Sequence, residues 1–262
     1  MAGKKPKIAL ALGAGSARGL AHIGVLQVLN ENGIYPDIIV GSSMGAMVGG
    51  IYACGADLAM LDKTIAKIDT RTFFDVKVPR MGFVAGNKIS SLLNLLTKKK
   101  QFNELDITLQ VVATDLITGR TIVIQEGSIA EAIRASISIP GVFHPVKREG
   151  MILVDGAITD RLPVDIALKN NADIVIAVDV TFTEDRSIEI RNVLDVIMSS
   201  LDLMQKRHFE DSAQNTDFLL QPKVGNFASS DFNKSVQIVE MGRQAAREQL
   251  DDILAAIAEL TR

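Results

Sequence analysis

The chain contains no tryptophan and only one cysteine, Cys54, among its 262 residues. A single cysteine excludes an intramolecular disulfide and fits a reducing compartment, so we expect a cytoplasmic location, with peripheral attachment to a membrane left open. The three histidines, His22, His144 and His208, stand in no sequence context typical of a catalytic triad. No group of His, Cys, Asp and Glu has the spacing of metal ligands, so neither a metal nor another cofactor is expected.

The sequence also lacks a strong net charge and a linker. A formal net charge of −3 argues against general binding to nucleic acid. No internal repeat, low-complexity tract or segment rich in Pro, Gly or Ser divides the chain. The length and the 47% of hydrophobic residues suit one α/β domain over residues 1–262, with core motifs in 7–180 and a C-terminal extension over 181–262.

Two stretches resemble targeting or membrane segments. The first 17 residues have a basic start and an apolar run, as signal peptides do. Cleavage there would remove a predicted strand and a glycine-rich loop, so a structural role is the better interpretation. Residues 38–56 carry no charge but contain five glycines. A buried strand, a tight turn and a helix explain them better than a membrane span.

The segment Gly41-Ser42-Ser43-Met44-Gly45 has the form G-x-S-x-G. It follows a β-branched run, Ile38–Val40, and precedes apolar residues that continue as a helix, which places a serine on a sharp strand-to-helix turn. The glycines Gly41 and Gly45 allow this turn and leave room for a substrate. Ser43 is therefore predicted to be a nucleophile, and its neighbour should point away from the substrate.

A second glycine-rich loop, Gly13–Gly19, separates an apolar run ending at Leu12 from apolar residues at helical spacing over 20–29. Backbone N–H groups at the start of a helix favour negative charge, which in an ester hydrolase is the developing oxyanion. The alternative is a dinucleotide-binding loop. That fold expects an acidic residue at the end of the second strand, where this chain has Gly41, and Asp37 precedes the strand instead.

The order strand, loop, helix, strand, turn, helix over residues 7–56 predicts a βαβ unit with parallel strands. Ligand sites of such sheets lie at the carboxyl ends of the strands, where both loops are. The predicted fold class is α/β, with a central, largely parallel sheet between helices. We expect further strands at 107–114, 121–125, 151–154, 173–180 and 218–220, a helix at 128–135 capped by Ser128, helical segments within 56–103 with a turn at 79–82, and amphipathic helices at 188–209 and 236–260.

A hydrolytic serine needs a base, and Asp155 is the candidate that the sequence offers. It stands in the segment LVDGA at 153–157, at the end of an apolar run, where Gly156 leaves the carboxylate uncrowded. An aspartate can accept the serine proton if burial and a direct hydrogen bond tune its pKa. An aspartate in this position could instead cap a helix or pair with a basic side chain.

The loop Gly13–Gly19, the elbow at 41–45 and the Asp-Gly-Ala at 155–157 occur in an order that resembles the patatin-like phospholipase family, in particular its compact bacterial members. Supporting segments are AHIGVL at 21–26, VATDL at 112–116 and SIPGVF at 138–143. The resemblance covers residues 7–180 and implies a patatin-like three-layer fold. It also implies a Ser–Asp dyad without histidine, with Ser43 as nucleophile and Asp155 as base.

The resemblance assigns the oxyanion hole to Gly15, Ser16 and Ala17, followed by Arg18. The family commonly has a run of glycines where this chain has Ala14-Gly15-Ser16, a change that keeps the N–H groups but could narrow the site. Arg18 could assist the loop electrostatically or hold it by hydrogen bonds to carbonyl groups.

On this resemblance the expected function is hydrolysis of a fatty-acyl ester of a phospholipid, a lysophospholipid or a related lipid. Acyl transfer and thioester hydrolysis are alternatives, because any acceptor that reaches an acyl-enzyme can resolve it. A catalytically idle binding or regulatory protein is a second alternative, against which the intact Ser43 and Asp155 argue.

Several other residues and segments have either a structural role or a role that the sequence leaves open. His22 and His144 are expected to be structural, and Asp115 and Asp179, each at a strand end, could support the site. The stretch LLNLLTKKK at 92–100 could lie on an anionic membrane surface or form a surface helix with a solvated end. The C-terminal helices could pack on the domain or form a homodimer.

Overall fold

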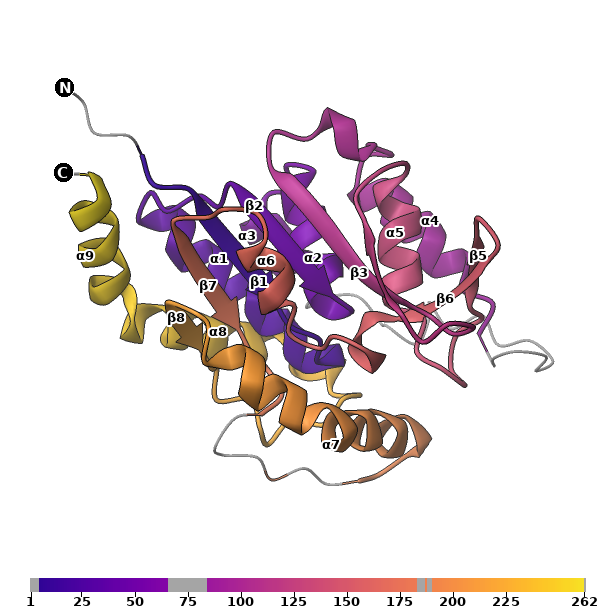
Figure 1. Ribbon diagram of the computed structural model, residues 1–262. Coiled ribbons are helices and arrows are strands. Elements are labelled where there is room, and N and C mark those ends of the chain that lie inside the picture. Colours follow the sequence, from indigo (N-terminus) through magenta and orange to yellow (C-terminus); the bar gives the residue numbers. More distant parts are fainter. Residues whose placement is uncertain (1–4, 66–83, 183–186, 188–189, 262) are drawn as a thin grey trace.

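The computed structural model describes residues 5–65, 84–182, 187 and 190–261 (Figure 1). Within these ranges one sheet of eight strands runs in the order β5-β6-β3-β2-β1-β7-β8, and β4 pairs with β3 outside this path. The strands are β1 (Ile8–Leu12), β2 (Ile38–Ser42), β3 (Thr108–Asp115), β4 (Thr121–Ile124), β5 (Val146–Arg148), β6 (Met151–Asp155), β7 (Ile174–Val178) and β8 (Phe218–Leu220).

The strands β3, β2, β1, β7 and β8 are parallel, and β4, β5 and β6 pair antiparallel. This confirms the predicted α/β class with a largely parallel sheet. In the register of β1, Leu12 lies opposite both Gly41 of β2 and Val178 of β7. The carboxyl ends of these three strands therefore meet at one edge, which brings the glycine-rich loop beside the elbow.

Helices cover both faces of the sheet (Figure 1). Successive residues of a strand point to opposite faces, so Leu10 and Leu12 join a large apolar cluster while Ala9 and Ala11 join a smaller one. The helical elements are η1 (Ser16–Leu20), α1 (Ala21–Glu31), α2 (Met44–Ala53), α3 (Leu58–Ile65), α4 (Asn87–Leu96), η3 (Phe102–Glu104), α5 (Ile129–Ser136), η4 (Gly156–Ile158), α6 (Val164–Leu168), α7 (Val193–Ala213), η5 (Phe232–Lys234), α8 (Ser235–Glu248) and α9 (Leu250–Thr261), where η marks a 3₁₀ helix.

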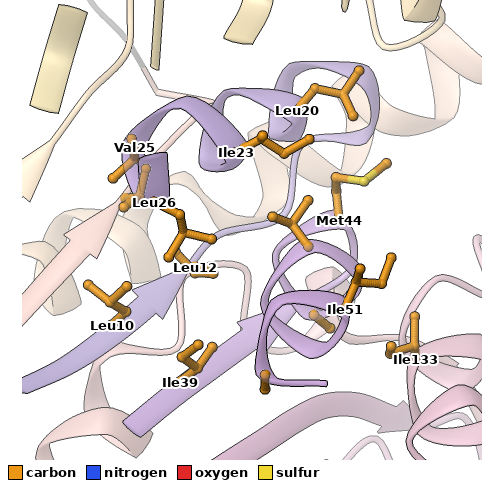
Figure 2. Close-up of a cluster of buried hydrophobic side chains, with 14 of the residues drawn as sticks. Leu10, Leu12, Leu20, Ile23, Val25, Leu26, Ile39, Met44, Ile51 and Ile133 are labelled. Carbon is orange, nitrogen blue, oxygen red and sulfur yellow. The ribbon is translucent and has the colours of Figure 1, made fainter. Parts of the chain in front are cut away.

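The larger cluster is the main core. Leu10, Leu12 and Ile39 from the strands meet Ile23 of α1 and Ile51 of α2, all of them aliphatic (Figure 2). On the opposite face, α6 and α7 cover the smaller cluster. Burial of these side chains is the dominant favourable term in folding, at roughly 25 cal/mol per Å² of apolar surface.

The C-terminal extension packs directly on the first helix. A Cβ on Gly24 of α1 would lie 2.0 Å from the Val239 carbonyl oxygen, and a Cβ on Gly242 of α8 would lie 2.0 Å from that of Ala21. Only glycine permits this approach, so the two backbones fit together at these positions. Helix α8 of the predicted C-terminal extension therefore packs closely on α1, and a single domain over residues 1–262 stays a prediction.

Several element boundaries differ from the predictions. The helix expected at 236–260 is two helices, because Gln249 leaves the helical conformation and donates a side-chain hydrogen bond to the Leu219 carbonyl at 2.8 Å. The helix expected at 188–209 runs instead from Val193 to Ala213. Strand β5 and helix α6 were not predicted, and the turn expected at 79–82 lies outside the described residues.

The uncharged stretch 38–56 forms β2, the elbow and α2, as predicted. Across the described ranges, every helix is too short or too polar to cross a membrane.

Candidate active site

Ser43 connects β2 to α2 and adopts φ 52° and ψ −118°. A positive φ is strained for a residue with a side chain, so the surroundings must hold this turn. The flanking glycines allow it: a Cβ on Gly41 would lie 2.5 Å from the Ala46 backbone, and one on Gly45 would lie 2.0 Å from the Leu12 carbonyl oxygen. The sharp strand-to-helix turn predicted from the sequence is present.

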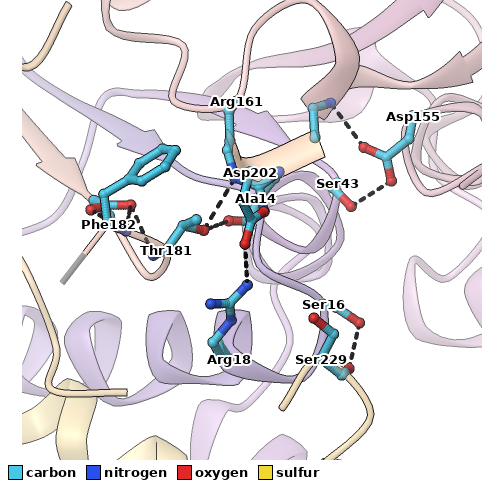
Figure 3. Close-up of polar contacts among 12 residues, drawn as sticks. Ala14, Ser16, Arg18, Ser43, Asp155, Arg161, Thr181, Phe182, Asp202 and Ser229 are labelled. Carbon is cyan, nitrogen blue, oxygen red and sulfur yellow. Dashed lines mark hydrogen bonds and ion pairs between the residues drawn. The ribbon is translucent and has the colours of Figure 1, made fainter. Parts of the chain in front are cut away.

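Ser43 shares a hydrogen bond with Asp155, as Figure 3 shows. The Ser43 hydroxyl donates to Oδ2 of Asp155 at 2.7 Å, and the other oxygen, Oδ1, accepts the N–H of Ala157 at 2.9 Å. The two residues are 3% and 1% exposed. The Ser43 N–H donates to Oγ of Ser136 at 2.8 Å, which fixes the backbone of the turn.

Asp155 reaches the site from β6, which runs antiparallel to β3 and places Asp155 opposite Ala113. Gly156 makes the exit from this strand possible, since a Cβ there would lie 2.4 Å from the Val112 carbonyl oxygen and 2.8 Å from Oγ of Ser42. The Ser42 side chain thus lies beside the Asp-Gly turn, and it does not line the pocket that Ser43 lines.

Burial raises the pKa of the Asp155 carboxyl from 3.8 to about 6, against the hydrogen bonds from Ala157 and Ser43 and the charge of Arg161, which lower it. A carboxylate with a pKa near 6 is ionised at neutral pH and is also basic enough to share a proton with a hydroxyl. The arrangement can therefore activate Ser43 without another base.

The glycine-rich loop leads into η1, where Ser16 has φ 51°. The Ala17 N–H donates to the Ser229 carbonyl at 3.2 Å, and the Arg18 N–H donates to the Gly15 carbonyl at 3.1 Å. Within the described part of the chain, the N–H groups of Gly15 and Ser16 have no acceptor. Of the three donors assigned by resemblance, the Ala17 N–H is thus already engaged, which limits the predicted oxyanion hole to the N–H groups of Gly15 and Ser16.

Contacts from three sides hold this loop. Nε2 of His22 lies 2.7 Å from the Gly13 carbonyl oxygen, and burial lowers the pKa of this histidine to about 4, so the neutral ring donates to the loop. A Cβ on Gly15 would lie 2.4 Å from Cγ2 of Val180. A Cβ on Gly19 would lie 2.5 Å from Cγ of Met44, so both glycines are needed for close packing.

The Arg18 side chain contacts a carboxylate, and no hydrogen bond from it to a carbonyl group is found among the described residues, while its electrostatic effect on the loop stays a prediction. Its side chain is buried and forms an ion pair with Asp202 of α7, with Nη2 3.0 Å from Oδ2. Sequence reasoning missed Asp202, together with Arg161 and Thr181, which also border the loop. No motif marks these residues, because they meet only through tertiary packing: Asp202 lies on α7, Thr181 in the turn after β7, and Arg161 between η4 and α6.

The other residues singled out by sequence lie away from the dyad. Asp115 accepts hydrogen bonds from Ile117 and Thr118 in the β3–β4 turn. Asp179 accepts the N–H groups of Thr181 and Phe182 after β7, and supports the turn next to the loop. His144 lines a separate polar pocket beside α5, and Nε2 of the half-exposed His208 lies 4.0 Å from Oδ1 of Asp160.

Ser43 and Ser16 open into an apolar pocket with a cavity volume of about 150 Å³. Its walls come from α2, α3, α4, the segment after α5 and Phe232. Leu92 and Leu96 of α4 line this pocket, and Leu95 is 74% exposed. The leucine run at 92–96 therefore forms part of the pocket wall through Leu92 and Leu96, whereas Leu95 faces outward, and contact of this helix with a membrane stays a prediction.

Among the described residues, no group of three or more His, Cys, Asp or Glu side chains is arranged to hold a metal ion.

Comparisons with known proteins place this geometry in context. The model of the patatin-like phospholipase family matches residues 10–168. A protein of Mycobacterium tuberculosis, named as an uncharacterised NTE family protein, is 40% identical over 181 residues, covering 68% of this chain and 50% of the relative. Patatin-like phospholipase domain-containing protein 7 of Mus musculus is 27% identical over 278 residues, covering 93% of this chain and 20% of the relative.

Among solved structures, VipD from Legionella pneumophila matches with a TM-score of 0.70 at 15% identity, over 96% of this chain and 68% of that one. This likeness shows the fold alone. The chain spans about half the length of the mycobacterial relative and a fifth of the mouse protein.

Proposed function

Because this chain belongs to the patatin-like phospholipase family, we propose that it hydrolyses fatty-acyl esters, with Ser43 as nucleophile and Asp155 as general base. The observation that carries the proposal is the 2.7 Å hydrogen bond between these side chains, beside an apolar pocket that Ser43 lines. A nucleophile and a base within hydrogen-bond reach, beside unused backbone donors, are the parts that acyl transfer requires.

The reaction follows from these contacts. Asp155 accepts the Ser43 proton as Oγ attacks the ester carbonyl carbon, and the N–H groups of Gly15 and Ser16 stabilise the oxyanion. The tetrahedral intermediate collapses, and the alcohol leaves with the proton held by Asp155. Water then attacks the acyl-enzyme, giving its proton to Asp155, and the Ser43 ester bond breaks to release the fatty acid and restore the hydroxyl.

The pocket supports a fatty acyl chain as the group transferred to Ser43. Its lining is almost wholly apolar, with Thr64 and two serines as the polar exceptions among the residues that form it. Each methylene moved from water into such a site is worth about 0.8 kcal/mol. A lipid ester therefore gains binding energy there that a short, polar ester does not.

A lipid substrate bears on where the protein acts and what it meets. The proposed enzyme needs no cofactor and meets lipid at a membrane or in micelles. Peripheral membrane contact, a cytoplasmic location and a homodimer stay predictions. The apolar wall formed by α4 faces the pocket, so it supports substrate binding in preference to membrane docking.

The test combines activity and labelling. Purified wild-type protein, Ser43→Ala and the matched control Ser42→Ala are assayed against a panel of phospholipids, lysophospholipids, thioesters and acyl acceptors. We expect release of free fatty acid by wild type and Ser42→Ala only. Transfer of the acyl group to an acceptor in preference to water would favour the acyltransferase alternative. A wild-type protein that neither converts any of these substrates nor reacts with a fluorophosphonate would favour the alternative of a catalytically idle binding protein.

A further inference from the structure

Asp202 lies on α7, outside the residues that the family model matches, and its side chain is fully buried. Its Oδ2 lies 3.0 Å from Nη2 of Arg18, and its Oδ1 forms a second ion pair with Nη2 of Arg161 (Figure 3). The two arginine side chains are 0% and 2% exposed. One carboxylate thus stands between two buried guanidinium groups.

One of these arginines, Arg18, is part of the glycine-rich loop, and the other, Arg161, contacts it. Arg18 is part of η1, two residues after Ser16. The Arg161 carbonyl accepts the Ala14 N–H at 2.9 Å, and its Nε donates to Oγ1 of Thr181 at 3.2 Å. Thr181 in turn donates to the Ala14 carbonyl at 2.9 Å. Arg161 therefore secures both backbone groups of Ala14, the residue before Gly15.

Electrostatics make the carboxylate necessary for this arrangement. Two like charges repel strongly where water is excluded, and an opposite charge between them removes the repulsion. Burial lowers the pKa of Arg161, Asp202 opposes that shift, and Arg18 adds to it. Without the carboxylate the guanidinium groups would move apart, and the loop that carries Arg18 would move with it.

We propose that Asp202 is a positioning residue, which holds Arg18 and Arg161 together so that the N–H groups of Gly15 and Ser16 stay directed at the reacting carbonyl. The C-terminal extension then completes the active site through α7. The expected effect of Asp202 on the rate of hydrolysis rests on the proposed function. Its expected effect on the structure, an ordered loop at 13–20, is independent of any substrate.

The experiment compares three variants with wild type. Asp202→Asn removes the central charge. The double variant Arg18→Gln/Asp202→Asn removes both ion pairs of Asp202, which we call the clamp, without changing the net charge of the three side chains Arg18, Arg161 and Asp202. It leaves one unpaired buried arginine where the single variant leaves two, so it serves if the single variant folds poorly. Arg243→Gln is the matched control, since it breaks the ion pair between α8 and α3, where Nη2 lies 2.7 Å from Oδ2 of Asp62.

Kinetics use a long-chain p-nitrophenyl ester, and amide hydrogen exchange follows the peptide covering residues 13–20. We expect both clamp variants to lose at least about tenfold in kcat with KM within about threefold, since a misplaced oxyanion donor acts on the transition state. Exchange at 13–20 should be faster in both. Arg243→Gln should change neither kinetics nor exchange at this loop.

Unchanged kcat in the folded double variant would overturn the inference, as would an equal loss in Arg243→Gln. If wild type hydrolyses no ester, the proposed function fails, but the exchange measurement still decides this inference. Loop protection that stays at the wild-type level in both clamp variants would then overturn it.

Discussion

The Ser43 hydroxyl and the Asp155 carboxylate lie 2.7 Å apart although 112 positions separate them in the sequence. One comes from the turn after a parallel strand and the other from the end of an antiparallel strand two positions away in the sheet. No imidazole stands between them, since His22 contacts the Gly13 carbonyl and the other two histidines lie elsewhere. The pairing is what a dyad that works without histidine requires.

Replacing Ser43 by Ala should remove activity without unfolding the protein. We expect kcat/KM to fall at least about 10³-fold, because no other group can form the acyl-enzyme. The change removes one hydroxyl, so the midpoint of thermal unfolding should stay near that of wild type. Mass spectrometry after fluorophosphonate treatment should find the adduct on Ser43, and an adduct on Ser42 or Ser16 would refute the assignment.

Replacing Asp155 by Asn should abolish most activity, because the amide cannot accept the Ser43 proton. The same change should stabilise the fold at high pH. The folded-state pKa of about 6 exceeds the ordinary 3.8, so this carboxyl favours the folded state at low pH, and that contribution is lost as the pH rises through 6. At pH 8 the neutral amide should raise the free energy of unfolding, by at most about 3 kcal/mol. Urea unfolding at pH 8 and pH 4 measures this, and a less stable variant at pH 8 contradicts it.

The histidines provide the control for this prediction. Gln in place of His22, His144 or His208, one at a time, should keep at least about a tenth of the activity, since loss of a general base costs about 10²–10⁴-fold. His22→Gln should be the most affected, because it alters the contact with the Gly13 carbonyl at 2.7 Å. A histidine variant as inactive as Asp155→Asn would show that the dyad hypothesis is wrong.

The pH profile should report the Asp155 carboxyl. We expect kcat/KM to rise with pH and level off above an apparent pKa near 6, because only the ionised carboxylate accepts a proton. Asp155→Asn should lose this limb along with its activity. An acidic limb near 4 in wild type would mean that burial does not perturb this group in the free enzyme.

The sequence was most informative where one local rule dictates the structure. G-x-S-x-G requires a strand-to-helix turn, and an uncharged run such as 38–40 before it forms a buried strand, so β2, Ser43 and α2 could be predicted. The parallel order of β1 and β2 followed from the helix between them. Asp155 could be proposed from its place after the apolar run 151–154, and the family resemblance agreed with it, but its antiparallel approach could not be predicted, because strand direction depends on the partner strand.

Tertiary contacts decided what the sequence could not. The Ala17 N–H is engaged because Ser229, over two hundred residues later, presents its carbonyl. The break at Gln249 depends on a hydrogen bond to Leu219, and the partner of Arg18 depends on α7. Each of these contacts joins residues of different segments of the chain, and a local sequence pattern in either segment does not predict such a contact.

The glycine-rich loop should act through backbone N–H groups, and Gly15 is its most sensitive position. The φ of Gly15 is 177°, an extended value that alanine also adopts, so a Cβ there fails for steric reasons alone, 2.4 Å from Cγ2 of Val180. Gly15→Ala should lower kcat by about 10²-fold, the typical loss of an oxyanion donor, and Val180→Ala in the same chain should restore part of it. Ser16→Ala keeps its N–H and should cost less.

The same loop also tests the dinucleotide alternative. Titration calorimetry of wild type with NAD or ATP should detect no specific binding, because the second strand ends in the elbow and not in an acidic residue. A micromolar dissociation constant that Gly15→Ala abolishes would overturn the hydrolase interpretation of the loop.

Chain-length preference should depend on the α4 wall of the pocket. Leu96 lines the cavity, and its neighbour Leu95 is 74% exposed, so the two positions form a matched pair on one helix. Leu96→Trp fills space that an acyl chain would occupy, and excluding two methylenes at about 0.8 kcal/mol each costs roughly tenfold in kcat/KM. The ratio of kcat/KM for hexadecanoyl over butanoyl p-nitrophenyl esters should therefore fall about tenfold in Leu96→Trp and stay unchanged in Leu95→Trp. Equal ratios in the two variants would show that the acyl chain binds outside this pocket.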